Sequence, residues 1–286
     1  SSADLGARVG MLAPAEASAF APFIGKNPAS KTTLTGKLDV SSARITLSDI
    51  NGTLGDTAAF QGSANVDRAA PEPAVDLDVT VKNLTHNGLT FPEIRLKGRS
   101  TKGGADLQNL SGTISGKDSF VLSGSVKNVE PNTQFDLAYA VKTDGLKNIA
   151  QALKFPLPPP FPSWKNADIK GTIKGDVQQH SFTMEGHVDE KEVSLSGSGG
   201  GEYRLDLHLR HSNAASVLDA LGLPVAGLLG ENGPVDLSGT IQGSGENYIL
   251  DKIRAQAGAS PLLGSLEKKD SRYLAGLTVD KINLDQ

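Results

Sequence analysis

Pairs of glycines recur four times along this chain at a nearly constant separation, and they constrain its fold more than any other feature. The separation is 26 residues in three pairs and 25 in the fourth: Gly36 and Gly62, Gly98 and Gly124, Gly171 and Gly197, and Gly239 and Gly264. The spacing indicates an internal repeat whose copies begin 62, 73 and 68 residues apart. Because glycine tolerates positive φ, we expect these residues at turns and bulges of antiparallel meanders, each copy closing with Gly-Ser at a strand end.

Strict alternation of apolar and polar residues follows the second glycine of the first three copies. It is typical of a strand with one buried face. The large apolar residues all fall at odd numbers: Val75, Leu77, Val79, Val81, Phe135, Leu137, Tyr139, Val141, Leu205, Leu207 and Leu209. We therefore predict a mainly β fold, in which repeated antiparallel meanders form a long, curved, groove-like sheet and these eleven side chains line one apolar face.

Two short amphipathic helices are predicted between meanders. Residues 144–155 and 212–223 each place apolar residues at i, i+3, i+4 and i+7, and the two segments are 68 residues apart. A third helix is weakly indicated in residues 5–23. The proline-rich stretch 156–162 fits a connector better than a polyproline ligand, because it occupies the place that residues 223–234 fill one repeat later. The Asn87-Gly88 dipeptide predicts a two-residue hairpin turn.

The repeats give the expected domain organisation. Residues 1–33 are predicted to be a helical lead-in or linker, residues 34–142 to hold repeats one and two, and residues 143–286 to hold repeats three and four with their helices. We expect one continuous repeat domain, belonging to a longer protein.

Composition narrows the possible functions. The net charge is −4 and the basic residues are scattered, which is unlike a nucleic-acid-binding protein. The absence of cysteine excludes disulfides, thiolate metal sites and cysteine nucleophiles. No apolar run is long enough to cross a membrane as a helix.

A search for catalytic and metal-binding motifs gives only weak matches. The segment 112–118 is the nearest approach to a phosphate-binding loop, but it is one residue short between its glycines and has Asp118 where magnesium needs Ser or Thr. The five histidines form no recognised metal motif, and alternation places the side chains of His208 and His211 on opposite faces. Asp76 and Asp78 share the polar face of a strand, where carboxylates usually only keep that face hydrated. We expect no enzyme activity, no cofactor and no metal.

The apolar face of such a sheet must be covered. A second layer, the short helices, a partner protein or a lipid could cover it. Leu, Val and Ile dominate the face, which suits acyl chains better than sugars, since sugars usually require aromatic stacking and hydrogen-bonding side chains.

Several segments resemble the repeated core of AsmA-like proteins of the bacterial cell envelope, a family related to AsmA and TamB. The resemblance is carried by residues 206–209, 215–224 and 233–241, by residues 81–91 and by the end of the chain, 277–285. It covers most of the chain from about Leu34 onward, although its motifs are degenerate β-repeat patterns.

The resemblance implies a periplasmic protein that is tethered to the inner membrane by an N-terminal anchor outside this sequence. It implies an open hydrophobic β-groove that carries phospholipid acyl chains, with a role in phospholipid transport or in outer-membrane biogenesis and homeostasis. The alternative is a structural or tethering protein of envelope assembly, with a closed core, no lipid cargo and envelope proteins as partners.

Overall fold

The computed structural model describes most of the β-structure of the chain. The described residues are 2–4, 33–54, 57–69, 74–86, 88–101, 103–114, 118–129, 132–146, 165–213, 234–245, 247–257, 260–270 and 272–279. The chain divides into two compact units, unit 1 (Ser1–Tyr139) and unit 2 (Ala140–Gln286). The boundary lies within one strand, close to the repeat boundary expected after residue 142.

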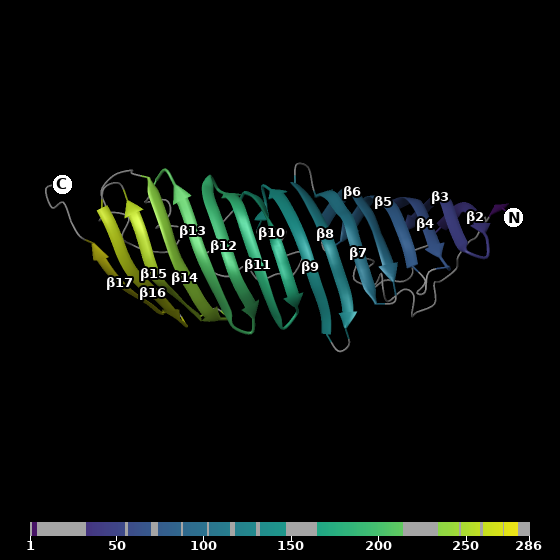
Figure 1. Cartoon of the computed structure of the whole chain (residues 1–286). Coiled ribbons are helices and arrows are strands. Elements are labelled where there is room, and N and C mark those ends of the chain that lie inside the picture. The colour runs from purple at the N-terminus through teal and green to yellow at the C-terminus, as the bar shows by residue number, and fades with distance from the viewer. Residues whose placement is uncertain are drawn as a thin grey trace. The chain divides into compact units, whose positions relative to one another are not determined.

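Unit 1 is an antiparallel meander in which consecutive strands lie side by side (Figure 1). Its strands are β1 (Ser2–Asp4), β2 (Thr33–Val40), β3 (Arg44–Leu54), β4 (Ala58–Asp67), β5 (Ala74–His86), β6 (Leu89–Thr101), β7 (Gly104–Ile114), β8 (Asp118–Val129) and β9 (Asn132–Thr143), of which β9 crosses the boundary. The short β1 pairs with β2. The hairpin predicted at Asn87-Gly88 is confirmed, because His86 pairs directly with Leu89 and Gly88 has a φ of 80°.

Unit 2 is a second antiparallel meander, again with consecutive strands as neighbours (Figure 1). Its strands are β10 (Ala167–Asp176), β11 (Gln179–Val188), β12 (Lys191–Gly200), β13 (Tyr203–His211), β14 (Val235–Ser244), β15 (Asn247–Ala257), β16 (Ser260–Lys269) and β17 (Arg272–Val279). Asp189 and Glu190, with φ of 46° and 69°, form the tight turn between β11 and β12. The prediction of a mainly β chain of repeated antiparallel meanders is confirmed.

The glycine repeat corresponds to four strands per copy. The first glycine of each pair lies in the first strand of a copy (β2, β6, β10 or β14) and the second lies in the third strand (β4, β8, β12 or β16). The alternating segments are the fourth strands, β5, β9 and β13. The expectation of bulges holds for Gly36, Gly98 and Gly239, which lie at register shifts between neighbouring strands. The expectation of turns and strand ends was wrong, because the glycines lie inside strands.

Close backbone approach explains why glycine is needed inside these strands. A Cβ at Gly197 would overlap the carbonyl oxygen of Arg204 on β13, and a Cβ at Gly124 would overlap that of Asp136 on β9. Gly124 also has a φ of 131°, which residues with side chains rarely adopt. The glycines therefore let neighbouring strands approach closely across the apolar face.

Bulges repeat with the glycines. The register shifts between Leu47 and Ile50 in β3 and between Leu250 and Ile253 in β15, both of which are second strands. In β7, the second strand of the second copy, the shift lies between Leu107 and Leu110. A bulge adds one residue to a strand, so that the apolar residues switch between odd and even numbers without leaving their face.

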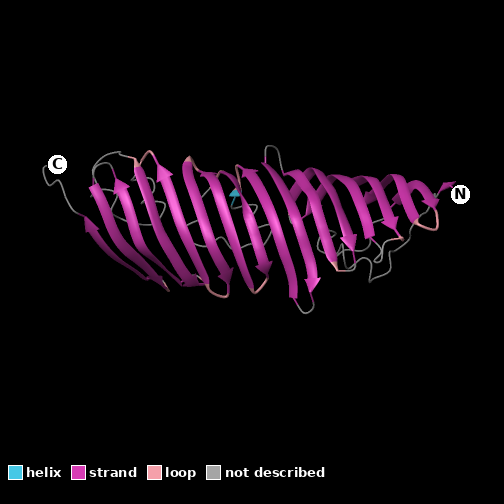
Figure 2. Ribbon diagram, viewed as in Figure 1, coloured by secondary structure: helices cyan, strands magenta, loops and turns pink. Residues whose placement is uncertain are grey.

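The predicted helices fall almost wholly outside the described residues, as do the helix suggested for residues 5–23 and the connector 156–162. The chain is helical at Leu146, the last described residue before the gap in the first helical segment (Figure 2). Elsewhere the described residues are strands joined by turns (Figure 2).

Candidate functional site

The apolar face of unit 1 consists of rows of side chains that cross the strands. Residues in direct register share a face, so that each row runs from strand to strand. The three central rows are Leu47, Ala64, Leu77, Gly98, Leu107 and Gly124; Ile50, Gly62, Val79, Leu96, Leu110 and Leu122; and Phe60, Val81, Ile94, Gly112 and Phe120. No row contains a charged residue. We call this surface the unit 1 apolar face.

The unit 1 apolar face is only half-buried. Ile50 is the one residue of these rows that is fully buried, at 7% exposure, and all the others are of intermediate burial. The other buried apolar residues that the structure describes in unit 1, Ala58, Ala74 and Ile114, lie at strand ends. A sheet face in this condition retains solvent-accessible aliphatic surface.

One end of the unit 1 apolar face is aromatic. The rings of Phe91 and Phe120 meet edge to face, with centroids 6.3 Å apart and planes at 89°. The ring of Phe120 lies over Gly112, where a Cβ would come within 2.8 Å of it. Phe60 lies in the same row, in register with Val81. Aromatic rings thus cover the glycine gap and border the aliphatic rows.

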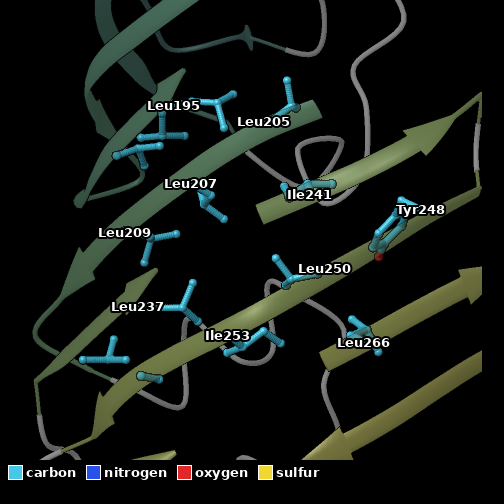
Figure 3. Close-up of a cluster of buried hydrophobic side chains, with 14 of the residues drawn as sticks. Leu195, Leu205, Leu207, Leu209, Leu237, Ile241, Tyr248, Leu250, Ile253 and Leu266 are labelled. Carbon is cyan, nitrogen blue, oxygen red and sulfur yellow. The ribbon is translucent and has the colours of Figure 1, made fainter. Parts of the chain in front are cut away.

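The equivalent face of unit 2 is closed. Rows of apolar residues cross β12 to β16 in the same manner, and their side chains gather into one cluster (Figure 3). Val193 and Leu237 are 1% exposed and Leu209 is 2% exposed. Leu146 packs against this cluster. We call it the unit 2 core.

The eleven predicted lining residues therefore divide between two environments. Those of β5 (Val75, Leu77, Val79 and Val81) and of β9 (Phe135, Leu137, Tyr139 and Val141) are of intermediate burial. Those of β13 (Leu205, Leu207 and Leu209) are at most 3% exposed. The β13 residues share one face, as predicted, but they belong to a packed core and are not open to a ligand. The lining role stays a prediction for β5 and β9.

Burial also affects the tyrosine among these residues. Desolvation raises the pKa of the Tyr139 hydroxyl above its ordinary value, as it does for Tyr203 in unit 2. Both hydroxyls therefore stay protonated at neutral pH. Neither tyrosine adds charge to the apolar face on which it lies.

The sequence search missed most of the apolar face in each unit, because it identified only the residues of β5, β9 and β13. Some of the missed residues are on strands whose alternation is interrupted: Leu107 and Leu110 flank the bulge of β7, and Leu250 and Ile253 flank that of β15. Alternation counted separately on each side of a bulge would have identified them.

The outer face of unit 2 carries a charged cluster. Arg210 Nε donates a hydrogen bond to Asp236 Oδ2 at 2.8 Å, and His208 Nε2 lies 2.6 Å from Asp236 Oδ1. The hydrogen bond from Arg210 lowers the pKa of Asp236, an effect that partial burial opposes and His208 reinforces. The cluster is about half exposed, which is typical of an ion-pair network on a hydrated sheet face.

His208 and His211 do not converge. His208 faces Asp236, whereas Nδ1 of His211 contacts the backbone of Asn213. In the described part of the chain, no three His, Cys, Asp or Glu residues are grouped so that they could hold a metal ion. Likewise, no helix within the described ranges is long and apolar enough to cross a membrane.

Comparison with known proteins adds no relative. The sequence matches no protein-family model, and neither the curated proteins nor the solved structures include one with significant similarity to it.

Proposed function

We propose that this chain is an AsmA-like periplasmic segment that binds phospholipid acyl chains on the unit 1 apolar face. The observation that carries the proposal is that three uncharged apolar rows, which cross β3 to β8, are only half-buried except at Ile50. In the full protein, an inner-membrane anchor would hold the segment in the periplasm. Its role would be phospholipid transport or outer-membrane homeostasis.

The rows favour an acyl chain over other apolar ligands. Adjacent strands lie about 4.8 Å apart, so a row across six strands presents an apolar track of about 24 Å. Such a track suits an extended hydrocarbon chain, each methylene of which gains about 0.8 kcal/mol on burial. The rows offer few hydroxyl or amide groups, so hydrogen-bonded ligands gain little there.

A structural role is the second candidate, and the unit 2 core favours it for that half of the chain. Leu205, Leu207 and Leu209 already fill a packed cluster and have no surface left for cargo. In that case the sheet would be a scaffold that acts through protein partners in envelope assembly. The two candidates differ in whether purified protein carries lipid.

The experiment is uptake of a fluorescent acyl probe by the full chain, together with native mass spectrometry for co-purified phospholipid. The test variant, Leu77→Asp with Val79→Asp, places two carboxylates on the unit 1 apolar face. The control, Ser111→Asp with Thr113→Asp, adds the same charge to the outer face of β7. We expect the test variant to lose most uptake and the control to retain it.

A second measurement covers the case in which the test variant does not fold. A benzophenone side chain introduced at Val79 should cross-link to phospholipid on illumination, whereas the same group at Asp78, on the opposite face of β5, should not. Equal cross-linking at both positions, or folded protein that carries no lipid and takes up no probe, would favour the structural role instead.

A further inference from the structure

A hollow lies on the outer face of unit 1, opposite the apolar rows. It has a volume of about 360 Å³ and is bordered by β2, β3, β4 and β5. Ala59 creates it: in register this short residue stands between Thr53 on β3 and Lys82 on β5, whose longer side chains rise on either side. The hollow is therefore a consequence of residue size in one cross-strand row.

A second row supplies neutral hydrogen-bonding groups along the hollow. Thr35, Asn51, Gln61 and Thr80 are in register across the same four strands. Thr35 Oγ1 donates to the carbonyl oxygen of Asn51 at 3.1 Å, and Asn51 Nδ2 donates to that of Asp49 at 2.9 Å. Within the described part of the chain, the side chains of Gln61 and Thr80 make no hydrogen bond, so their donors and acceptors face the hollow uncommitted.

Lys82 is the one charged residue that borders the hollow. Two carboxylates on neighbouring strands have other partners: Glu93, in register with Lys82, accepts a bond from Arg95 Nε at 2.7 Å, and Asp49 pairs with Lys37 at 2.8 Å. Among the residues that the structure describes, the Lys82 ammonium has no ion pair. The hollow thus combines one ammonium group with hydroxyl and amide groups, and the apolar Ala59 and Phe60 also line it.

We propose that this hollow binds a phosphorylated polyol, with the phosphate at Lys82 and the hydroxyls along Gln61 and Thr80. An ammonium binds phosphate through charge-assisted hydrogen bonds, and a row of amides and hydroxyls matches the alternating donors and acceptors of a polyol. The volume is at the lower end of the range for small-ligand sites, which is about 300 to 1,000 Å³. The ligand group could belong to a free sugar phosphate or to a lipid headgroup.

The test is an amide chemical-shift titration of the full chain with glycerol 3-phosphate, and with inorganic phosphate and glycerol separately. We expect glycerol 3-phosphate to bind more tightly than either fragment and to shift the amides of Ala59, Gln61 and Thr80. Lys82→Met should weaken binding by at least about tenfold, because a hydrogen bond to a charged group is lost. Ala59→Gln, which fills the hollow, should abolish binding.

Lys97→Met is the matched control, because Lys97 is an exposed lysine on the same outer face, on β6. It should leave binding unchanged. Equal weakening by Lys97→Met, or no shift at the three amides at saturating glycerol 3-phosphate, would overturn the proposal.

Vesicles of phosphatidylglycerol distinguish the two sources of the ligand. If Ala59→Gln also releases the protein from these vesicles, the ligand is a headgroup; if vesicle binding is unchanged, it is a free polyol phosphate. Both proteins in this comparison also carry Leu77→Asp and Val79→Asp, so that vesicle binding through the unit 1 apolar face does not hide a loss at the hollow.

Discussion

The two units use the same strand pattern but present it to different environments. In unit 1, Leu77 and Val79 of β5 are half-buried, whereas in unit 2 their counterparts on β13, Leu207 and Leu209, are 3% and 2% exposed. Alternation along a strand determines which side chains share a face. It does not determine whether that face is covered. Coverage is what distinguishes the half-buried face of unit 1 from the packed core of unit 2.

The largest expected effect comes from placing a charge on each face. Leu207→Asp buries a carboxylate in the unit 2 core without a partner and should destabilise the fold by more than about 4 kcal/mol. Leu77→Asp places the same group on the half-exposed unit 1 face, where water can solvate it, and should cost less than half as much. Urea unfolding of the two variants measures the difference.

Equal destabilisation by these substitutions would show that both faces are closed. In that case the unit 1 apolar face would be a core like that of unit 2, and the structural role would become the better assignment for the whole chain.

Glycine-to-alanine substitutions should destabilise both units alike. The glycines allow neighbouring strands to approach closely, and this does not depend on whether the apolar face is covered. Gly124→Ala in unit 1 and Gly197→Ala in unit 2 would each push a Cβ into a carbonyl oxygen of the next strand. We expect each to cost about 2 kcal/mol or more. Gly201→Ala is the control, since a Cβ there meets nothing within 4 Å. In thermal unfolding, Gly201→Ala should have a midpoint temperature close to that of the wild type.

A loss confined to Gly197→Ala would break this part of the comparison. It would mean that close strand approach matters only where the apolar face is packed, and that the open sheet of unit 1 can relax around an added methyl group.

The sequence was sufficient to predict the meander and the four-fold repeat. Both depend on local pattern: alternation identifies β5, β9 and β13, and Asn87-Gly88 identifies a hairpin. Glycine was harder to interpret, because the same lack of a Cβ that permits a turn also permits close strand packing. Its position within β4, β8, β12 and β16 is set by register with a neighbouring strand, and this is information that no single segment contains.

The candidate site was predictable only in part. The apolar residues of β7 and β15 were not predicted, and no single run of odd or even numbers contains them, since the residue that each bulge inserts reverses the numbering of a face. Exposure was not predictable, because Leu77 and Leu207 lie in the same kind of alternating strand, each directly after an aspartate. The hollow at Ala59 was not predictable because it depends on the register of β3, β4 and β5. The small side chain of Ala59 forms a hollow only because the longer side chains of Thr53 and Lys82 are in register with it.

The smallest expected effect compares the outer faces. Asp236 in unit 2 contacts both Arg210 and His208, whereas the one ionic partner of Asp76 among the described residues of unit 1 is Arg99, whose Nη1 lies 3.4 and 3.5 Å from its two oxygens. The lowered pKa of Asp236 means that its contribution to stability is present above the ordinary carboxyl value of 3.8 and is lost as the pH falls through the lowered value. The contribution should be below about 1 kcal/mol, because the pair is half exposed and screened by salt. Asp236→Asn should therefore lower the free energy of unfolding at neutral pH and match the wild type in strong acid, and Asp76→Asn should show a smaller difference. If the free energies of unfolding of Asp236→Asn and the wild type differ by the same amount at every pH, the cluster is stabilised by packing and neutral hydrogen bonds rather than by the charge of Asp236.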